Sequence, residues 1–305
     1  SELESFVKAD LETYDLKELN LDLEIAEEAI ERDLLEGLED LNSEDTIRAR
    51  LDHFSIEGSL ESDYLERLYK VDKDNKFLYG IRHLGGNPNL PFIQLQTNFG
   101  IECKMKALEL YNKIEKEFSK FSPLYLSFQS KIPIDADFIG SIFMVAPTCN
   151  IDSRIPWDSE DRIQFEDAES DQYYPWYEAG YSAFHEDSPE LKEKVTLNAK
   201  DVMDNSLEQG LLKYILIDGE RVGLIAGENS QLLGHSGTYF NEIFLQKKWK
   251  GQGLAKAIQR KFISEFAKGS QLIWGTIDSN NLPSYKTAYS NGRRPIRYEN
   301  FINLK

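Results

Sequence analysis

Residues 247–261, KKWKGQGLAKAIQRK, contain six lysines and arginines and no acidic residue. The whole chain has 35 basic and 53 acidic residues and a net charge of −18, so this stretch reverses the local sign of charge. Gly251 and Gly253 lack a Cβ, which lets a ligand come close to the backbone. They stand between a strand-like segment and a helical one, and the free amides at the start of a helix attract anions. The stretch therefore predicts a site for a small polyanion.

Two common phosphate motifs do not fit this stretch. A P-loop needs GxxxxGK followed by Ser or Thr, and the sequence has no such match, which argues against nucleoside triphosphate hydrolysis. A dinucleotide fingerprint needs a third glycine, but Lys256 stands at that place after Gly251 and Gly253. A glycine turn beside a solvated lysine face is the purely structural alternative, because a GxG pair alone is a weak signal.

The run from Leu245 to Ala255, LQKKWKGQGLA, resembles the acetyl-coenzyme A signature of the GNAT superfamily of N-acetyltransferases. That signature follows a strand and reads Gln or Arg, two residues, Gly, one residue, then Gly or Ala. In this register Lys250 takes the place of Gln or Arg, a departure that keeps the cation. Gly253 and Ala255 take the places of the two small residues.

A second stretch, NNLPSYKTAYSNGR, is similar to the motif NxxAxxxYxxxG of the same family. Asn281, Ser284 and Gly292 are in register with it. Together the two motifs, separated by one expected helix and one expected strand, extend the resemblance over residues 162–305.

The resemblance implies acetyl-CoA, or coenzyme A, as the cofactor. It implies that the loop amides hold the pyrophosphate, that Lys248, Lys250 and Lys256 balance its charge, and that strands 237–246 and 271–278 separate to admit the pantetheine arm. Backbone groups near Leu245 would then bond that arm. The cofactor-binding residues that we expect are Phe244, Leu245, Gln246, Lys250, Gly251, Gln252, Gly253, Leu254, Ala255, Lys256, Asn281 and Ser284.

Acetyl transfer to an amine needs a base, because an ammonium group must first lose a proton. Glu242 interrupts an apolar run in the strand that leads into the signature loop, where an unpaired acid is costly. We therefore expect Glu242 to be the base or the anchor for the amine; a carboxylate that faces solvent or pairs with a lysine is the alternative. Glu178 is a weaker candidate for the same role.

The resemblance also implies a tyrosine as the acid that protonates the leaving thiolate, seven residues after the Asn of the second motif. This sequence has Ala288 at that position. Tyr289 and Tyr285 are the nearest hydroxyls and the candidates for the role, although tyrosines on a short amphipathic helix also serve as packing residues.

The acceptor site is expected near residues 165–190, which include the run DAESDQYYPWYEAGYSAFHED. Aromatic rings and carboxylates together suit a cationic amine. They suit a buried packing face equally well, and the sequence leaves both interpretations open for Trp176, Tyr173, Tyr174, Tyr177 and Tyr181.

The elements that must position these residues follow from hydrophobic periodicity. In the first half we expect two or three helices in 11–54, strands at 76–84 and 91–99, a helix at 104–118, and strands at 123–132 and 138–146. In the second half we expect a strand at 162–167, helices at 173–184 and 198–210, a hairpin at 211–228 that turns at Asp218-Gly219, a strand at 237–246, a helix at 253–269, a strand at 271–278, a helix at 282–292 and a last strand at 297–304.

This order predicts a mixed α/β (α+β) fold with a mostly antiparallel sheet, a central strand–helix–strand unit and flanking helices, similar to the GNAT fold. The polar stretch 147–162 suggests a boundary, so we expect domains at 1–155 and 156–305. The first domain has no match to the signature loop. If it is a degenerate second copy, the arrangement resembles that of tandem-GNAT proteins.

Composition limits the other possibilities. Residues 1–50 hold seventeen acidic and five basic residues, a net charge of −12, which disfavours nucleic acid and anionic membranes as partners. Cys103 and Cys149 form no CxxC motif and the four histidines are scattered, so we expect neither a disulfide framework nor a metal, and a cytoplasmic location. No apolar run approaches the length that spans a membrane.

The leading hypothesis is thus an acetyl-CoA-dependent N-acetyltransferase that acts on a primary amine of a small molecule or peptide by direct nucleophilic attack. A non-catalytic acyl-CoA-binding or protein-interaction module is the alternative, and a nucleotide-binding oxidoreductase is a third possibility. The sequence leaves the acceptor and the oligomeric state open.

Overall fold

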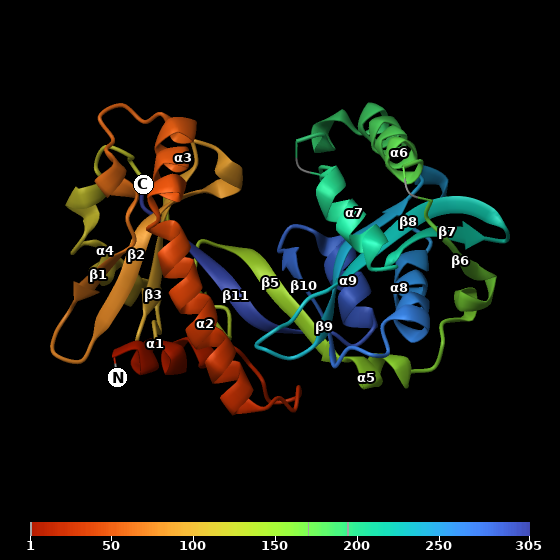
Figure 1. The fold of residues 1–305 in the computed structure, drawn as a ribbon, viewed down its shortest axis with the longest axis horizontal. Helices are drawn as coiled ribbons and strands as arrows, with labels where there is room; N and C mark the ends of the chain where they lie inside the picture. Colours follow the sequence, from red (N-terminus) through yellow and green to blue (C-terminus); the bar gives the residue numbers. More distant parts are fainter. Residues whose placement is uncertain (1, 170, 194) are drawn as a thin grey trace. The chain divides into compact units, whose positions relative to one another are not determined.

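The structure, a computed structural model, describes residues 2–169, 171–193 and 195–305. The chain forms two compact units (Figure 1). Unit 1 holds the chain up to Phe143 together with Asp278–Asn280 and Pro295–Lys305, and unit 2 holds Met144–Ile277 and Asn281–Arg294. The chain thus enters unit 2 at Met144 and not near residue 156, and its last residues return to unit 1.

Unit 1 combines an N-terminal group of helices with hydrogen-bonded strands in the order β1-β2-β3-β4-β11. Strands β3 and β4 are parallel and the other neighbours are antiparallel. Its elements are α1 (Glu2–Leu11), α2 (Leu23–Leu41), α3 (Glu44–Phe54), β1 (Arg67–Lys70), β2 (Lys76–His83), β3 (Pro91–Thr97), α4 (Lys104–Tyr111), β4 (Tyr125–Ser130) and β11 (Arg294–Asn303), with β5 (Phe138–Pro147) leading into unit 2.

Local signals set several of these boundaries. Asp22 caps α2 by accepting from the amides of Glu24 and Ile25, and Ser43 caps α3 in the same way. The helix expected at 104–118 ends at Tyr111, because the amides of Lys113 and Ile114 bond carbonyls three residues back instead of four.

The last strand completes unit 1 because Phe301 and Ile302 are buried there and β11 pairs with β4, for example Phe301 with Ser127.

Unit 2 contains the sheet order β10-β9-β8-β7-β6, antiparallel except for the pair β9 and β10. Its elements are α5 (Thr148–Asp152), β6 (Ile163–Asp167), α6 (Tyr173–Asp187), α7 (Lys200–Glu208), β7 (Leu212–Ile217), β8 (Glu220–Asn229), β9 (Gly237–Leu245), α8 (Leu254–Phe266), β10 (Leu272–Asp278) and α9 (Leu282–Ser290). The expected hairpin turn is confirmed: Asp218 and Gly219 have φ of 51° and 82°.

Two apolar clusters cover the two faces of this sheet. Helices α6 and α7 bury Tyr173, Tyr177 and Met203 against one face, and α8 buries Ile258 and Phe262 against the other (Figure 1). The expected mixed, mostly antiparallel α/β fold is confirmed. Each unit has one strand–helix–strand connection between parallel strands, β3–α4–β4 and β9–α8–β10.

Candidate active site

Strands β9 and β10 pair over a short distance and then part. The parallel register joins Gly237–Tyr239 to Leu272–Trp274, whereas β9 continues to Leu245 and β10 to Asp278. Along the rest of β9 the β8 side stays paired up to Leu245. The edge of β9 that faces β10 is thus unpaired beyond Tyr239, as expected for strands that separate to admit a ligand. We call this place, just beyond the pair Tyr239–Trp274, the fork.

A β-bulge lies at the fork. Ala226 of β8 opposes Glu242, and the next residue, Gly227, opposes Phe240, so Asn241 is the extra residue on β9. The bulge turns two consecutive polar side chains toward the same face: Asn241 donates to Ser206 of α7 (3.2 Å), and Glu242 reaches α6. A regular strand would send one of them to the α8 face, because side chains alternate.

Two tyrosines of α6 hold the carboxylate of Glu242. Its Oε2 accepts hydrogen bonds from the hydroxyls of Tyr177 (2.6 Å) and Tyr181 (2.7 Å). The amide of Asn198 donates to the Tyr177 oxygen (3.0 Å), which leaves the proton of that hydroxyl for Glu242. Burial raises the pKa of Glu242 above its ordinary value, although both hydroxyls oppose the rise. The carboxylate is therefore a stronger base than an exposed one.

Close packing of α6 on β9 makes these hydrogen bonds possible. A Cβ at Gly180 would lie 2.6 Å from Cζ of Phe244, so a glycine is needed where the helix crosses this ring. Tyr173, Tyr177 and Tyr181 recur every four residues and are all buried. These three rings form a packing face, and two of their hydroxyls also serve Glu242. The spacing of four residues between these tyrosines indicates such a face from the sequence. Nothing in the sequence indicates that two of the hydroxyls contact Glu242.

The charge of Lys250 acts on this carboxylate and lowers its pKa, although less than burial raises it. The Nζ of Lys250 lies 3.8 Å from the ring centroid of Phe184 and 5.9 Å from that of Phe244. Desolvation lowers the pKa of Lys250, and the charge of Glu242 opposes that effect. The lysine in the signature position thus faces α6 and Glu242.

The loop after β9 presents backbone amides at the start of α8. Gly251 and Gly253 have φ of 75° and 71°, a conformation that favours glycine, and Gly253 is the N-cap of α8. In the described chain no side chain caps this helix start. The amide side chain of Gln252 bonds back to the carbonyl of Lys248 (2.7 Å), which tightens the turn. Uncapped amides and the positive helix end suit a phosphate.

In the folded chain, several of the cations in residues 247–261 are occupied by partners from other parts of the protein. Arg260 forms a buried ion pair with Glu160 (2.8 Å), and Lys261 donates to the carbonyls of Glu160 and Ile163. These two cations are structural. Two others have exposed acidic partners: Lys247 pairs with Asp187 (3.1 Å), and Lys248 with Glu220.

Lys256 lies over the ring of Trp157, with its Nζ 3.9 Å from the centroid. Lys250 and Lys256 therefore remain as the two cations of this stretch that lie over aromatic rings and form no ion pair within the described part of the chain. The stretch itself contains no acidic residue, but acids distant in sequence fold against it and neutralise part of its charge.

The second motif forms helix α9. Asn281 caps the helix by accepting from the amide of Ser284 (3.2 Å). Tyr285 and Tyr289 stack on each other with ring centroids 6.1 Å apart, and Tyr289 is 47% exposed beneath Arg294. Ala288 is fully buried. The role of Tyr285 or Tyr289 as the acid stays a prediction. Glu178, the weaker candidate for the base, is exposed on α6.

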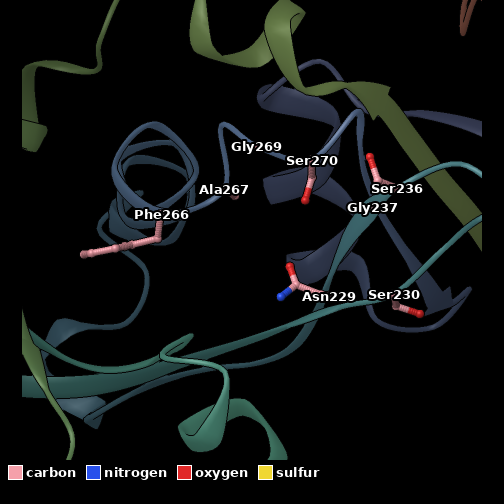
Figure 2. A pocket seen from close by; sticks show the side chains of 8 residues that line it. All are labelled: Asn229, Ser230, Ser236, Gly237, Phe266, Ala267, Gly269 and Ser270. Carbon is pink, nitrogen blue, oxygen red and sulfur yellow. The ribbon is translucent and has the colours of Figure 1, made fainter.

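A separate cavity of about 370 Å³ lies in unit 2 at the opposite end of α8 from Gly253. Figure 2 shows its lining: Asn229, Ser230, Ser236, Gly237, Phe266, Ala267, Gly269 and Ser270. None of these residues is charged, so the cavity does not suit a polyanion.

Among the described residues we find no cluster of His, Cys, Asp and Glu able to hold a metal ion, and no helix long and apolar enough to cross a bilayer.

Comparisons with known proteins give matches at the level of structure. No protein-family model and no curated protein sequence matches the chain. A GCN5-related N-acetyltransferase from Sphaerobacter thermophilus is similar with a TM-score of 0.47 and 10% identity, over 75% of this chain and 77% of that one. A GNAT-family acetyltransferase from Colwellia psychrerythraea has a TM-score of 0.48 and 12% identity, over 86% and 96% of the chains.

A GCN5-related N-acetyltransferase from Kribbella flavida is similar with a TM-score of 0.39 and 12% identity, over 84% of this chain and 93% of that one.

Proposed function

We propose that unit 2 is an acetyl-CoA-dependent N-acetyltransferase whose acceptor is a primary amine of a small molecule or peptide. The observation that carries the proposal is the position of Glu242. This half-buried carboxylate lies at a bulge beside the fork, on the same strand that leads to the uncapped start of α8.

The residues present fit the acyl donor. Backbone amides of residues 251–255 would hold the pyrophosphate, with Lys248 and Lys256 close enough in sequence to balance charge, and the ion pair of Lys248 with Glu220 is exposed and exchangeable. The unpaired edge of β9 between Asn241 and Leu245 would bond the amides of the pantetheine arm as a neighbouring strand does. When bound, the donor supplies an acyl group activated as a thioester.

Glu242 accepts the proton that the amine must lose. In the reaction the amine nitrogen bonds the acyl carbon, the carbon–sulfur bond breaks with its electron pair on sulfur, and the nitrogen proton passes to the carboxylate. A base is most effective when its pKa lies near the working pH, and burial moves the pKa of Glu242 in that direction. Tyr177 and Tyr181 fix the orientation of the carboxylate.

Free-thiol release tests the proposal. The protein is incubated with acetyl-CoA and a panel of amines, namely polyamines, amino acids, aminoglycosides and peptides with free N-termini. The expected result is thiol release that depends on one class of amine. Saturable acetyl-CoA binding without release from any acceptor would instead favour a non-catalytic acyl-CoA-binding module. Stabilisation by NAD(P) and not by CoA would contradict both.

A further inference from the structure

Arg293 is a buried cation without an acidic partner in the part of the chain that the structure describes. Its residue is 3% exposed and it follows α9. One guanidinium nitrogen, Nη2, donates to Oε1 of Gln259 (3.3 Å), and the buried Nε has no partner. Burial lowers the pKa of Arg293 to about 10, which is still high enough to keep the guanidinium charged at neutral pH.

The guanidinium lies at the fork. Its Nη1 is 3.3 Å from the point where a Cβ on Gly275 would stand, and Gly275 is the first residue of β10 beyond the last pair with β9. Its Cζ is 6.0 Å from the ring centroid of Phe240, the corresponding first residue on β9. A glycine at position 275 thus leaves room for the charged group against both diverging strands.

This arrangement is costly for the protein without a ligand. A buried charge that is neither paired nor fully hydrogen-bonded destabilises the folded state, and an apolar side chain of similar length would avoid that cost. Arg260, on the same face of the sheet, also has a buried Nε without a partner, but its charge is met by an ion pair with Glu160 and by bonds to two carbonyls. The contrast indicates that Arg293 is set to meet a negative charge from outside the chain.

The position favours the sulfur end of the donor over its phosphates. The phosphates are assigned to the loop before Leu254, whereas Gln259, the partner of Arg293, lies five residues further along α8, about 7–8 Å at 1.5 Å per residue. The nearby side chains of α9 offer no positive charge to the sulfur, because Ala288 has no polar side-chain atom and Tyr285 stacks on Tyr289.

We propose that Arg293 provides the positive charge that stabilises the thiolate released when the acyl group is transferred. The inference rests on the proposed function. The electron pair of the breaking carbon–sulfur bond stays on sulfur as a thiolate paired with the guanidinium, while the proton of the amine goes to Glu242. No proton has to leave Arg293, so the step needs no separate acid.

The pKa of the thiol of bound CoA tests the inference without turnover. Thiolate absorbs in the ultraviolet, so the protein–CoA complex is titrated with pH and compared with free CoA, whose thiol is expected at about 8.5. The variants are Arg293→Met, which removes the charge, Arg293→Lys, which keeps it, and Arg294→Met as the matched control at the exposed neighbour.

In the wild type we expect the bound thiol to titrate at least one pH unit below the Arg293→Met complex, a tenfold shift in the thiol–thiolate equilibrium. Arg293→Lys should retain most of the shift, and Arg294→Met all of it. Equal thiol pKa values in wild type and Arg293→Met would overturn the inference. A lower thermal stability of Arg293→Met would also overturn the inference. Removal of an arginine that only stabilises the fold lowers stability, whereas removal of an unpaired buried cation does not.

A second measurement uses the wild type alone. Desulfo-CoA lacks the sulfur, so above the thiol pKa the protein should bind CoA at least tenfold more tightly than desulfo-CoA, and the ratio should fall toward one as the pH is lowered. A ratio that does not change with pH overturns the role of Arg293 while leaving the proposed function intact. Failure of both ligands to bind would overturn the proposed function itself.

Discussion

The hydroxyl of Tyr181 donates a 2.7 Å hydrogen bond to the carboxylate of Glu242, across 61 residues of sequence. The same carboxylate oxygen accepts from Tyr177, one helical turn earlier. These bonds stabilise the ionised carboxylate in a place where burial disfavours it. Glu242 is thus held in one orientation and is more basic than an exposed glutamate.

Glu242→Gln should abolish most acyl transfer and leave CoA affinity nearly unchanged. The amide keeps the shape of the side chain but accepts no proton, and loss of a general base typically lowers turnover by about a hundredfold to ten-thousandfold. Steady-state rates and calorimetric CoA binding check this. Glu228→Gln, in the neighbouring strand β8, is the control. A variant with wild-type turnover would remove Glu242 as the base.

Tyr181→Phe should move the acidic limb of the pH–rate profile to higher pH. The Tyr181 hydroxyl lowers the pKa of Glu242, so its removal raises that pKa further. Tyr173→Phe, which loses a bond from the same helix to Asp204 instead, should leave the limb in place. A limb that stays fixed or moves to lower pH in Tyr181→Phe would contradict the contact.

The unfolding free energy should depend on pH through Glu242. Its pKa in the folded state lies above the value of 4.5 expected for the unfolded chain. Below pH 4.5 both states are protonated; above it the unfolded state ionises first, so stability falls by up to about 1.4 kcal/mol per pH unit until the folded-state pKa is passed.

Glu242→Gln lacks this loss. Its stability relative to the wild type should therefore increase as the pH rises from 4.5, measured by urea unfolding at a series of pH values. A difference that is constant or decreases with pH would show that the carboxylate is not buried in this way.

Gly253→Asp should destroy CoA binding while the protein stays folded. Asp adds a negative charge among the amides assigned to the pyrophosphate, and the positive φ of this residue costs about 1–2 kcal/mol for a side chain. Gly210→Asp is a matched control, because Gly210 has φ of 70° and open space around it. We expect the two variants to lower the melting temperature by the same amount, and only Gly253→Asp to lose CoA binding. Retained affinity in that variant would refute the loop assignment.

The sequence predicts the parts of this site that depend on local chemistry. Gly251 and Gly253 were recognisable because a tight, left-handed loop needs them, and Glu242 because an acid interrupts an apolar strand. The bulge at Asn241 had no sequence signal, since it appears only in the register between β8 and β9. The same holds for the contacts of Glu242 with α6.

Long-range contacts explain the remaining differences. Glu160 lies 100 residues from Arg260 and neutralises a cation that seemed free for a ligand. The final strand belongs to unit 1 because it pairs with β4 and buries Phe301 and Ile302 there. Hydrophobic periodicity predicts the strand but not the strand with which it pairs. Whether unit 1 is a degenerate copy of unit 2 remains a prediction, motivated by the parallel strand–helix–strand connection in each.

Calorimetric titration of the wild-type protein with CoA and acetyl-CoA measures whether the amides at the start of α8 hold the pyrophosphate. We predict saturable heat for both ligands and weaker affinity at higher salt, because charged phosphates contribute to binding. Absence of any heat at millimolar ligand would contradict the account.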